Sequence, residues 1–227
     1  MNHGFVKVAS AIPSVKVADC QYNVEQIESL IVQAEGHGVE VICLPELSLT
    51  AYTCQDLFQQ QLLLDEAEMA LIHLMNFTRS LDIISIVGLP VPYKGSLLNC
   101  AAVIQKGKIL GMIPKTYLPN YKEFYEKRWF TSGTDIPAGS LLVCGQQVPL
   151  NQFILFRTPS CTFGVEICED VWAPIPPSSY LAMQGAEIIF NLSADNDLVG
   201  KYTYLKNLLG QQSARTISGY VFSSCGY

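Results

Sequence analysis

The feature that most constrains the fold is an alternation of short apolar runs with longer amphipathic segments. Residues 23–38 have the apolar spacing of a helix that buries one face, and Asn23 is its expected N-cap. The following run, "VEVICLP" at residues 39–45, has the length and continuous apolarity of a buried strand. Strands that alternate with helices in this way predict an α/β domain with layers and a mixed sheet.

The same alternation continues along the chain. We expect further helices at residues 60–81 and 202–218, and surface loops at 117–140 and 170–180, where long loops are commonly functional. Residues 180–195 combine a helix end, a turn and a buried strand. Further strands are expected at residues 5–13, 82–91, 96–105, 108–117, 161–168 and from 219 onward, with "KGK" as a hairpin turn between 96–105 and 108–117.

Size and charge exclude several classes of protein. The 227 residues suffice for one sizeable core, so we expect a single domain over residues 1–227. The net charge of −6 argues against binding to nucleic acid or to a membrane through a basic surface. No apolar run approaches the roughly 18 to 20 residues that span a bilayer, and the N-terminus lacks the apolar core of a secretory signal. We therefore expect a cytoplasmic protein.

The cysteines and histidines are not spaced as metal ligands. The eight cysteines form no CxxC pair and several lie in apolar runs, so we expect reduced thiols and no disulfide framework. His3, His37 and His73 all lie in the first third of the chain, without a partner at ligand spacing. We assign no metal site.

One cysteine stands apart because of its position. Cys168 follows the apolar run at residues 161–167, within "FGVEICEDVW", and precedes Glu169 and Asp170. A residue at a strand end, where the chain turns, is held by the sheet and presented to a substrate. The alternative is a buried structural cysteine. Because acidic neighbours disfavour a thiolate, a nucleophile here needs a base and a cation from elsewhere in the chain.

Two distant stretches offer these groups. Glu46 follows the strand at residues 39–45 in apolar surroundings, which tend to raise the pKa of a carboxyl group and suit a general base. Lys115 ends another apolar strand and would place a cation beside Glu46 and Cys168, favouring the thiolate and stabilising an oxyanion. Taken singly, each of the two charges is more often a solvated residue at a strand end.

Together, these stretches resemble the motifs of the nitrilase, or carbon–nitrogen hydrolase, superfamily. "LPELSLTAY", "PKTYLPNYKEFYEKRWF" and "GVEICEDVW" are similar to its glutamate, lysine and cysteine motifs, in that order. "KTYLPNY", "EKRWF", "ICEDVW" and "NLSA" with a later "GK" are similar to one subfamily, the N-terminal glutamine amidotransferase domain of glutamine-dependent NAD synthetase. The resemblance runs from about residue 5 to the C-terminus. It implies a nitrilase-like α-β-β-α sandwich with mixed sheets.

The resemblance also implies an activity. In that subfamily the domain hydrolyses L-glutamine to glutamate and ammonia, and the ammonia passes to an ATP-dependent synthetase domain that amidates deamido-NAD. Carried over by motif, Cys168 would form a thioester and Glu46 would be the general base. Lys115, joined by the backbone N–H of Glu169, would stabilise the oxyanion, and Glu126 in "EKRWF" would orient the lysine.

Four residues would form the glutamine pocket by the same resemblance. Tyr52 and Tyr121 match aromatic positions that line it, although either, taken alone, is more often a packed loop tyrosine. Glu169 matches the acid that receives the α-ammonium group, and Ser193 in "NLSA" would contact the α-amino-acid end. Asp170 is interpreted as structural.

The chain departs from the subfamily in length. It stops at "SSCGY" and lacks the "SGGxDS" loop of the synthetase domain, so we expect a C-terminally truncated sandwich without that domain. ATP, Mg and deamido-NAD would belong to the absent domain, which leaves no cofactor for this one. The implied partners are L-glutamine, a synthetase domain and further copies of the chain in a homo-oligomer.

Two other functions remain open. A stand-alone amidase or carbamoylase of the superfamily would keep Glu46, Lys115 and Cys168 but would not need an acid such as Glu169 for an α-ammonium group. A catalytically inactive regulatory domain is the second alternative, because fold does not imply function. The presence of all three catalytic residue types disfavours it.

Overall fold

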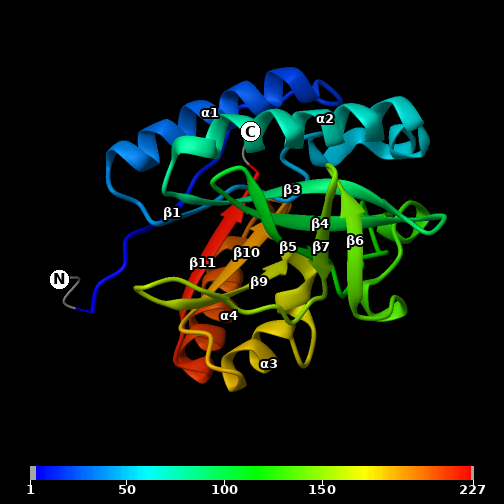
Figure 1. The fold of residues 1–227 in the computed structure, drawn as a ribbon. Coiled ribbons are helices and arrows are strands. Elements are labelled where there is room, and N and C mark those ends of the chain that lie inside the picture. The colour runs from blue at the N-terminus through cyan, green and yellow to red at the C-terminus, as the bar shows by residue number, and fades with distance from the viewer. Residues whose placement is uncertain (1–3, 226–227) are drawn as a thin grey trace.

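The computed structural model describes residues 4–225 and stacks its layers in the order helix, sheet, sheet, helix (Figure 1). Helices α1 (Cys20–Gly36) and α2 (Gln61–Phe77) cover the outer face of a seven-stranded sheet. A four-stranded sheet packs on its inner face and is covered by α3 (Pro177–Met183) and α4 (Lys201–Thr216). The predicted α-β-β-α sandwich is confirmed.

The larger sheet is mixed and has the strand order β1-β2-β3-β4-β5-β7-β6. Its first three strands are parallel, β3, β4 and β5 form an antiparallel meander, and β7 pairs parallel with β5. The hairpin of β6 and β7 was missed by the sequence analysis, which assigned no strand there. The strands are β1 (Val8–Ser10), β2 (Val41–Cys43), β3 (Ile84–Tyr93), β4 (Ser96–Gln105), β5 (Lys108–Pro114), β6 (Gly139–Val143) and β7 (Gln146–Leu150).

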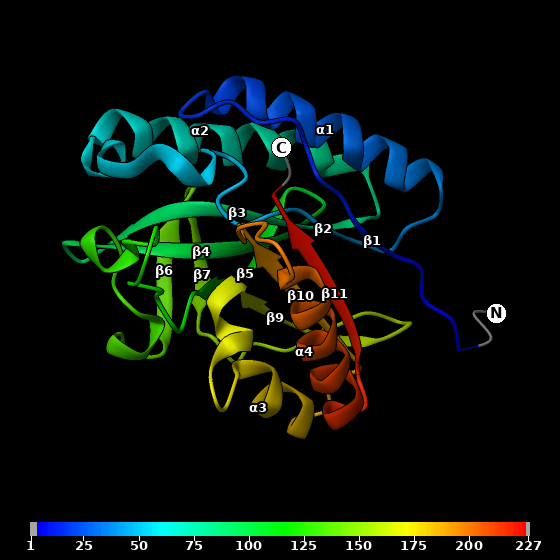
Figure 2. The ribbon, with the colours of Figure 1, turned by 180° about the vertical axis from the view of Figure 1, so that it is seen from behind.

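The smaller sheet has the order β11-β10-β9-β8. Its strands are β8 (Phe156–Arg157), β9 (Thr162–Ile167), β10 (Ile188–Ser193) and β11 (Gly219–Ser224). The last three are parallel, so their carboxyl ends lie at one edge, and Figure 2 shows α4 lying against β10 and β11. Cys168 directly follows β9 at this edge.

Two apolar cores hold the layers together, one on each face of the larger sheet. Ile86 and Val103 face the smaller sheet, where they join Val165 and Phe190 in a buried cluster. The other face packs on α1 and α2 through a second cluster. Because both faces are buried there, the central strands β2, β3 and β4 appear in the sequence as continuous apolar runs.

The start of the first helix corrects one prediction. Helix α1 begins at Cys20, and its N-cap is Asp19, whose side chain accepts a hydrogen bond from the Tyr22 N–H at 3.0 Å. Asn23 lies inside the helix, fully buried, where its side chain hydrogen-bonds both main-chain groups of Lys16. The asparagine therefore anchors the preceding segment and does not cap the helix.

Short 3₁₀ helices occupy the connections, including both predicted long loops. No helix within residues 4–225 has the length and apolarity that crossing a membrane requires. The 3₁₀ helices are η1 (Tyr52–Gln59), η2 (Thr78–Ser80), η3 (Glu126–Arg128), η4 (Gly133–Asp135) and η5 (Cys168–Trp172).

Candidate active site

Glu46 lies in a tight turn that follows β2 and is pressed against β3. Leu47, the next residue, has a left-handed backbone with φ of 50°. The turn approaches β3 so closely that a Cβ on Gly88 would lie 2.3 Å from the Leu47 nitrogen, so only glycine fits there. The Glu46 N–H donates to the carbonyl of Ser193 at 3.3 Å, which ties the turn to the end of β10. The Glu46 side chain is thereby buried between the two sheets.

Lys115 follows β5 and lies between two buried carboxylates. Its Nζ donates to Glu46 Oε1 and to Glu126 Oε1, both at 2.6 Å. Burial alone would lower the pKa of Lys115, but the charges of Glu126 and Glu46 raise it well above its ordinary value. Burial also raises the pKa of Glu126 to about 7, although Lys115 opposes this. Lys115 is therefore a permanent cation inside the domain.

Two neutral side chains complete this charged cluster. Asn99 of β4 donates its Nδ2–H to Glu46 Oε1 at 2.7 Å, and the Tyr52 hydroxyl donates to Glu126 Oε1 at 2.7 Å. The second oxygen of each glutamate is buried and has no hydrogen-bond partner within residues 4–225. Each carboxylate is thus held through one oxygen, and its other oxygen is free to accept a proton, as a general base requires.

Cys168 begins η5 directly after β9, with its backbone in the left-handed region at φ of 46°. This conformation is costly for a residue with a Cβ and persists where the surroundings impose it. Here the Cys168 N–H donates to Asn191 Oδ1 at 3.0 Å, and the Ser193 hydroxyl donates to Cys168 Sγ at 3.2 Å. Both partners come from β10, the neighbouring strand.

Cys168, the candidate nucleophile, is a thiol at rest. Burial and the negative charge of Glu46 raise the pKa of Cys168 well above its ordinary value, although Lys115 acts in the opposite direction. The sequence analysis expected Lys115 to favour the thiolate. Lys115 does lower the pKa of Cys168, but burial and the two nearby glutamates raise it by more, so the thiol stays protonated.

Asp170 connects the segment after Lys115 to the cysteine turn. Its Oδ1 accepts the N–H groups of Thr116 and Tyr117 at 3.0 and 2.7 Å, and its Oδ2 accepts the Ile167 N–H at 2.9 Å. The carboxylate therefore fixes the lysine strand relative to the cysteine strand. These contacts agree with the structural interpretation of this residue.

The predicted substrate-binding residues divide into two places. The Tyr121 hydroxyl donates to Glu169 Oε2 at 2.9 Å, and both residues line an open cleft of about 860 Å³. Burial raises the pKa of Glu169. Tyr52 instead holds Glu126, and Ser193 is buried against the Cys168 thiol. The structure therefore pairs Tyr121 with Glu169 directly. Tyr52 and Tyr121 pack on the same ring, that of Phe124.

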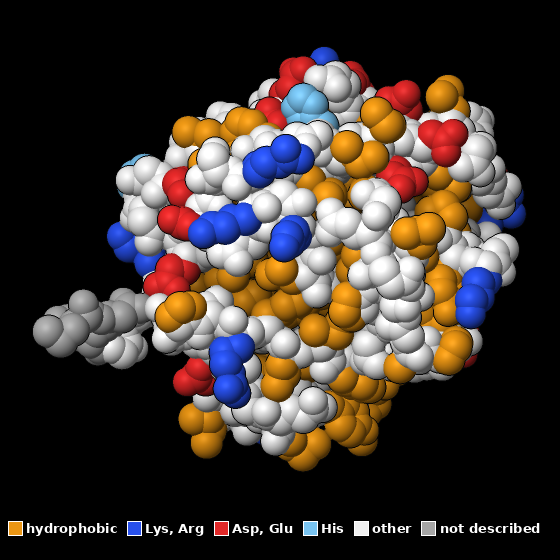
Figure 3. Space-filling view, viewed as in Figure 1, with side chains coloured by type: hydrophobic (Ala, Val, Ile, Leu, Met, Phe, Trp, Pro, Cys, Tyr) orange, Lys and Arg blue, Asp and Glu red, His pale blue; other side chains and the backbone are white. Residues whose placement is uncertain are grey.

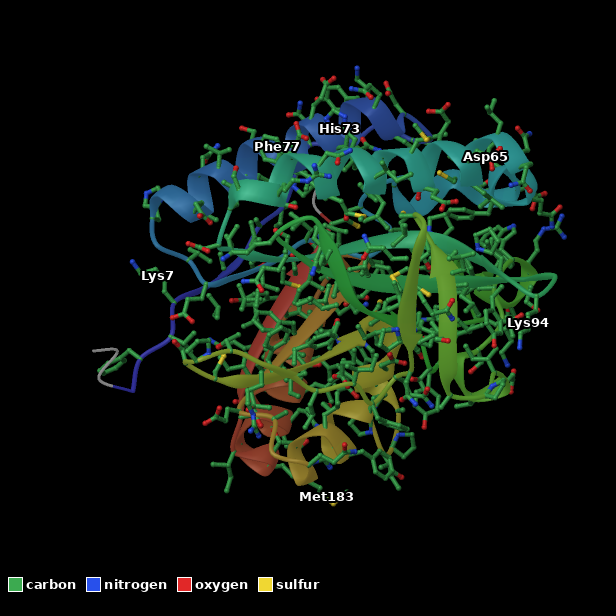
Figure 4. The ribbon with its side chains drawn as sticks, in the orientation of Figure 1. Lys7, Asp65, His73, Phe77, Lys94 and Met183 are labelled. Carbon is green, nitrogen blue, oxygen red and sulfur yellow. The ribbon has the colours of Figure 1, made fainter. Side chains whose placement is uncertain are left out.

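The described histidines have other partners. His73 on α2 pairs with Glu28 of α1 at 2.9 Å in the outer helical layer, as Figure 4 shows for His73. His37, which follows the last residue of α1, hydrogen-bonds the Gln33 carbonyl of that helix, and His3 lies outside the described residues. Among residues 4–225, no group of His, Cys, Asp and Glu side chains has the arrangement of a metal site. Because the described histidines have these other partners, Glu46 is the candidate base.

Comparison with known proteins assigns the family. The Carbon-nitrogen hydrolase family profile matches residues 7–224. The chain belongs to this family. It is 34% identical to the glutamine-dependent NAD(+) synthetase of Mycobacterium tuberculosis over 99% of this chain, but over only 33% of that protein. The chain therefore spans about a third of the length of these curated relatives.

Solved structures agree with this assignment. A glutamine-dependent NAD(+) synthetase from Cytophaga hutchinsonii superposes with a TM-score of 0.87 at 28% identity, covering 97% of this chain and 36% of that one. An amidase from Nesterenkonia sp. superposes with a TM-score of 0.78 at 17% identity, covering 96% of this chain and 75% of that one. The amidase shares the fold of this carbon–nitrogen hydrolase domain.

Sequence analysis missed two asparagines in this carbon–nitrogen hydrolase site. Asn99 holds Glu46, and Asn191 holds the backbone of Cys168. Each is a lone asparagine in an otherwise apolar strand, within "SLLNCAAVIQ" and "IIFNLS". A buried amide must find hydrogen-bond partners, so this pattern marks a polar contact inside the core. It does not identify the partner, because the partner comes from another strand.

Proposed function

We propose that the chain is a glutaminase that hydrolyses the side-chain amide of L-glutamine to glutamate and ammonia through a thioester on Cys168. The observation that carries this proposal is the buried Glu46–Lys115 pair acting on the Cys168 thiol, beside a cleft that presents Glu169. The similarity to proteins named glutamine-dependent NAD(+) synthetase supports glutamine as the amide.

The first half of the reaction would form the thioester. Because Cys168 is a thiol at rest, Glu46 takes its proton as sulfur attacks the amide carbon. An ammonium group has a third N–H beyond the two that Lys115 gives to the glutamates, and this N–H stabilises the oxyanion together with the Glu169 backbone N–H. Glu46 then returns the proton to the leaving nitrogen, and ammonia departs as the C–N bond breaks.

The second half would release glutamate. With ammonia gone, a water molecule takes its place and Glu46 removes one of the water protons as the oxygen attacks the thioester carbon. Lys115 stabilises the second oxyanion as it did the first. The C–S bond breaks, the sulfur recovers a proton from Glu46, and the free thiol is restored.

Glu169 would select glutamine from other amides. Its carboxylate faces the cleft, where Tyr121 holds it, and the α-ammonium group of glutamine needs an anionic partner. A stand-alone amidase or carbamoylase would use the same catalytic residues without this acid. An inactive regulatory domain would have no need to hold Lys115 between two buried glutamates, an arrangement that is costly unless it is used.

We further propose that the ammonia serves a synthetase domain that amidates deamido-NAD. ATP and Mg would act only in that domain, and the glutaminase steps above use side chains of this chain alone. The names of the relatives support this role, as does the fact that this chain covers about a third of their length. We place the protein in the cytoplasm, without membrane or nucleic-acid partners, in line with its acidic composition.

We also propose that the chain forms a homo-oligomer. Hydrophobic side chains gather over α3 at the lower end of the molecule (Figure 3), where Met183 projects outward (Figure 4). Met183 is 76% exposed, and Tyr202 and Tyr204 of α4 are also exposed. Exposed apolar surface of this kind favours association with another chain. Light scattering on the purified chain tests the proposal, which a monomer at high concentration would contradict.

A glutamine-like diazoketone electrophile tests the glutaminase proposal directly. After exposure of the chain to this reagent, intact mass spectrometry and peptide mapping should find one adduct, on Cys168, which excess glutamine prevents. Cys168→Ala should take no adduct, whereas Cys144→Ala, at a partly exposed cysteine outside the site, should be labelled like the unmodified chain. An adduct that glutamine does not prevent favours another amide as substrate, and a folded chain without any adduct contradicts the proposal.

A further inference from the structure

Three polar side chains of the smaller sheet form a hydrogen-bonded row that ends at the nucleophile. Glu166 lies on β9, Asn191 on β10 and Tyr220 on β11, three adjacent parallel strands. Glu166 and Asn191 are fully buried. The reaction proposed above assigns no role to any of the three.

The hydrogen bonds in this row fix the orientation of the Asn191 amide. Glu166 Oε2 accepts the Ser178 N–H at 2.7 Å, and Glu166 Oε1 accepts the Tyr220 hydroxyl. The single O–H of Tyr220 is used in that bond, so its oxygen accepts the Asn191 Nδ2–H at 3.1 Å. The amide oxygen of Asn191 must then face the other way, toward Cys168.

The Asn191 oxygen meets the backbone of the nucleophile. Oδ1 accepts the Cys168 N–H at 3.0 Å, and Nδ2 lies 3.5 Å from the Cys168 carbonyl. Cys168 has φ of 46°, a conformation that is strained for a residue other than glycine and needs external support. A reversed amide would turn an N–H₂ group toward the Cys168 N–H, and the support would be lost.

We propose that Asn191 is a positioning residue, oriented by Glu166 through Tyr220, that holds the Cys168 backbone in its left-handed turn. The turn aims the thiol at Glu46 and at the substrate carbonyl. Ser193, two residues along β10 and on the same face, holds the sulfur itself. One strand therefore fixes both the backbone and the side chain of the nucleophile. Because the Cys168 N–H is used in this way, oxyanion stabilisation must come from other groups.

Two substitutions test this role. Each removes a single hydroxyl, one from β11 and one from the residue just before that strand. Tyr220→Phe removes the hydroxyl that orients Asn191. Ser218→Ala removes a buried hydroxyl that donates to the Ala186 carbonyl at 2.9 Å and has no link to Cys168. We expect Tyr220→Phe to lower kcat for glutamine about 10-fold with KM nearly unchanged, because a small displacement of a nucleophile mainly weakens the transition state. Ser218→Ala should leave both constants unchanged.

Glu166→Gln tests the orientation itself. The new amide must keep its oxygen on the Ser178 N–H, so its N–H₂ faces Tyr220 and the hydroxyl proton turns toward Asn191. This variant keeps the size of the side chain but reverses the hydrogen-bond direction of the row. We expect a loss in kcat at least as large as that of Tyr220→Phe.

A spectroscopic readout separates this proposal from the proposed function, on which the kinetic test rests. In chain labelled with ¹⁵N-cysteine, the Cys168 amide resonance should shift and exchange faster with water in Tyr220→Phe and Glu166→Gln, but not in Ser218→Ala. This measurement needs no glutamine. An unmodified chain that fails to hydrolyse glutamine contradicts the glutaminase proposal only. Unchanged Cys168 amide resonances in folded Tyr220→Phe and Glu166→Gln overturn the positioning role.

Discussion

The two sheets support the site in different ways. The larger sheet and its loops supply charged groups, Glu46, Lys115 and Glu126, which are fixed by side-chain contacts with one another. The smaller sheet supplies Cys168, whose backbone is held by the neutral amide of Asn191. Buried charges need partners of opposite charge, whereas a nucleophile at a strand end needs a fixed backbone. Charge and geometry are thus controlled by separate halves of the domain.

The halves meet at main-chain contacts next to the reactive groups. The Glu46 N–H bonds the Ser193 carbonyl, and the Asp170 carboxylate accepts the Thr116 and Tyr117 N–H groups. The candidate base, cation and nucleophile are therefore aligned by the packing of one sheet on the other. Substitutions in the charged cluster of the larger sheet should change catalysis and, where a charge loses its partner, also stability and its pH dependence. Substitutions around Cys168 in the smaller sheet should mainly change kcat.

The largest effect is expected from Lys115→Met, which removes the cation between two buried carboxylates. Breaking a buried ion pair on one side costs about 3–5 kcal/mol of unfolding free energy, and glutamine hydrolysis should fall below detection. The stability loss should be smaller at pH 5 than at pH 7, because protonation then neutralises the unpaired carboxylates. Urea unfolding at both pH values measures this.

Lys108→Met is the matched control for that experiment. Lys108 begins the same strand, β5, but is exposed to solvent. Its substitution should change the unfolding free energy by less than about 0.5 kcal/mol. Equal losses in the two variants would show that Lys115 is not held by its buried partners.

The next largest effect separates the base from the framework. Glu46→Gln keeps an oxygen that accepts from Lys115 and Asn99 but replaces the free oxygen with N–H₂. The fold should remain, while acylation of Cys168 should slow by roughly 10² to 10⁴-fold. Single-turnover measurement of thioester formation gives this rate. Acylation at the unmodified rate would assign the base elsewhere.

The residues whose role depends on local chain position could be predicted from the sequence. Glu46, Lys115 and Cys168 each follow a recognisable apolar run, so their places at strand ends were predictable. The partners of Asn99 and Asn191 were not, because those contacts depend on which strands pair and in which register. The protonation state of Cys168 could not be predicted from the sequence either, because it follows from burial among three charges that come from distant segments.

Prediction of the fold from the sequence has the same limit. The strands at residues 82–91, 96–105 and 108–117 were predicted because they are long and apolar. The hairpin of β6 and β7 has five-residue strands with several exposed positions. Its turn at Cys144 and Gly145 has positive φ at both residues, which a cysteine does not indicate. The hairpin is stabilised by its place in the sheet more than by its own sequence.

A moderate effect is expected on the pH dependence of stability. Burial raises the pKa of Glu126 from 4.5 in the unfolded chain to about 7 in the folded protein. Between these values the folded state binds more protons, so stability falls as pH rises, by at most about 1.4 kcal/mol per pH unit. Glu126→Gln should remove this contribution and flatten the profile between pH 5 and 7. Glu123→Gln, at an exposed glutamate of the same loop, should not. Parallel profiles for the unmodified chain and Glu126→Gln would contradict the assignment.

The smallest expected effects come from two tyrosines that each hold a glutamate. Tyr52 donates to Glu126 inside the charged cluster, and Tyr121 donates to Glu169 at the cleft. Removing a hydrogen bond to a charged group costs about 1.5–3 kcal/mol when it is shielded from water and less when it is exposed. Tyr52→Phe should therefore lower kcat about 10-fold by loosening the partner of Lys115.

Tyr121→Phe should raise KM for glutamine only a few-fold and leave kcat unchanged, because Tyr121 is 50% exposed and water can replace its hydroxyl on Glu169. Steady-state kinetics on both variants, with glutamine and with a simple amide that lacks an α-amino group, gives the comparison. Tyr52→Phe should affect both substrates equally, and Tyr121→Phe should affect glutamine alone. Equal losses for both substrates in Tyr121→Phe would remove the Tyr121–Glu169 pair from glutamine recognition, since an effect that ignores the α-ammonium group cannot pass through Glu169.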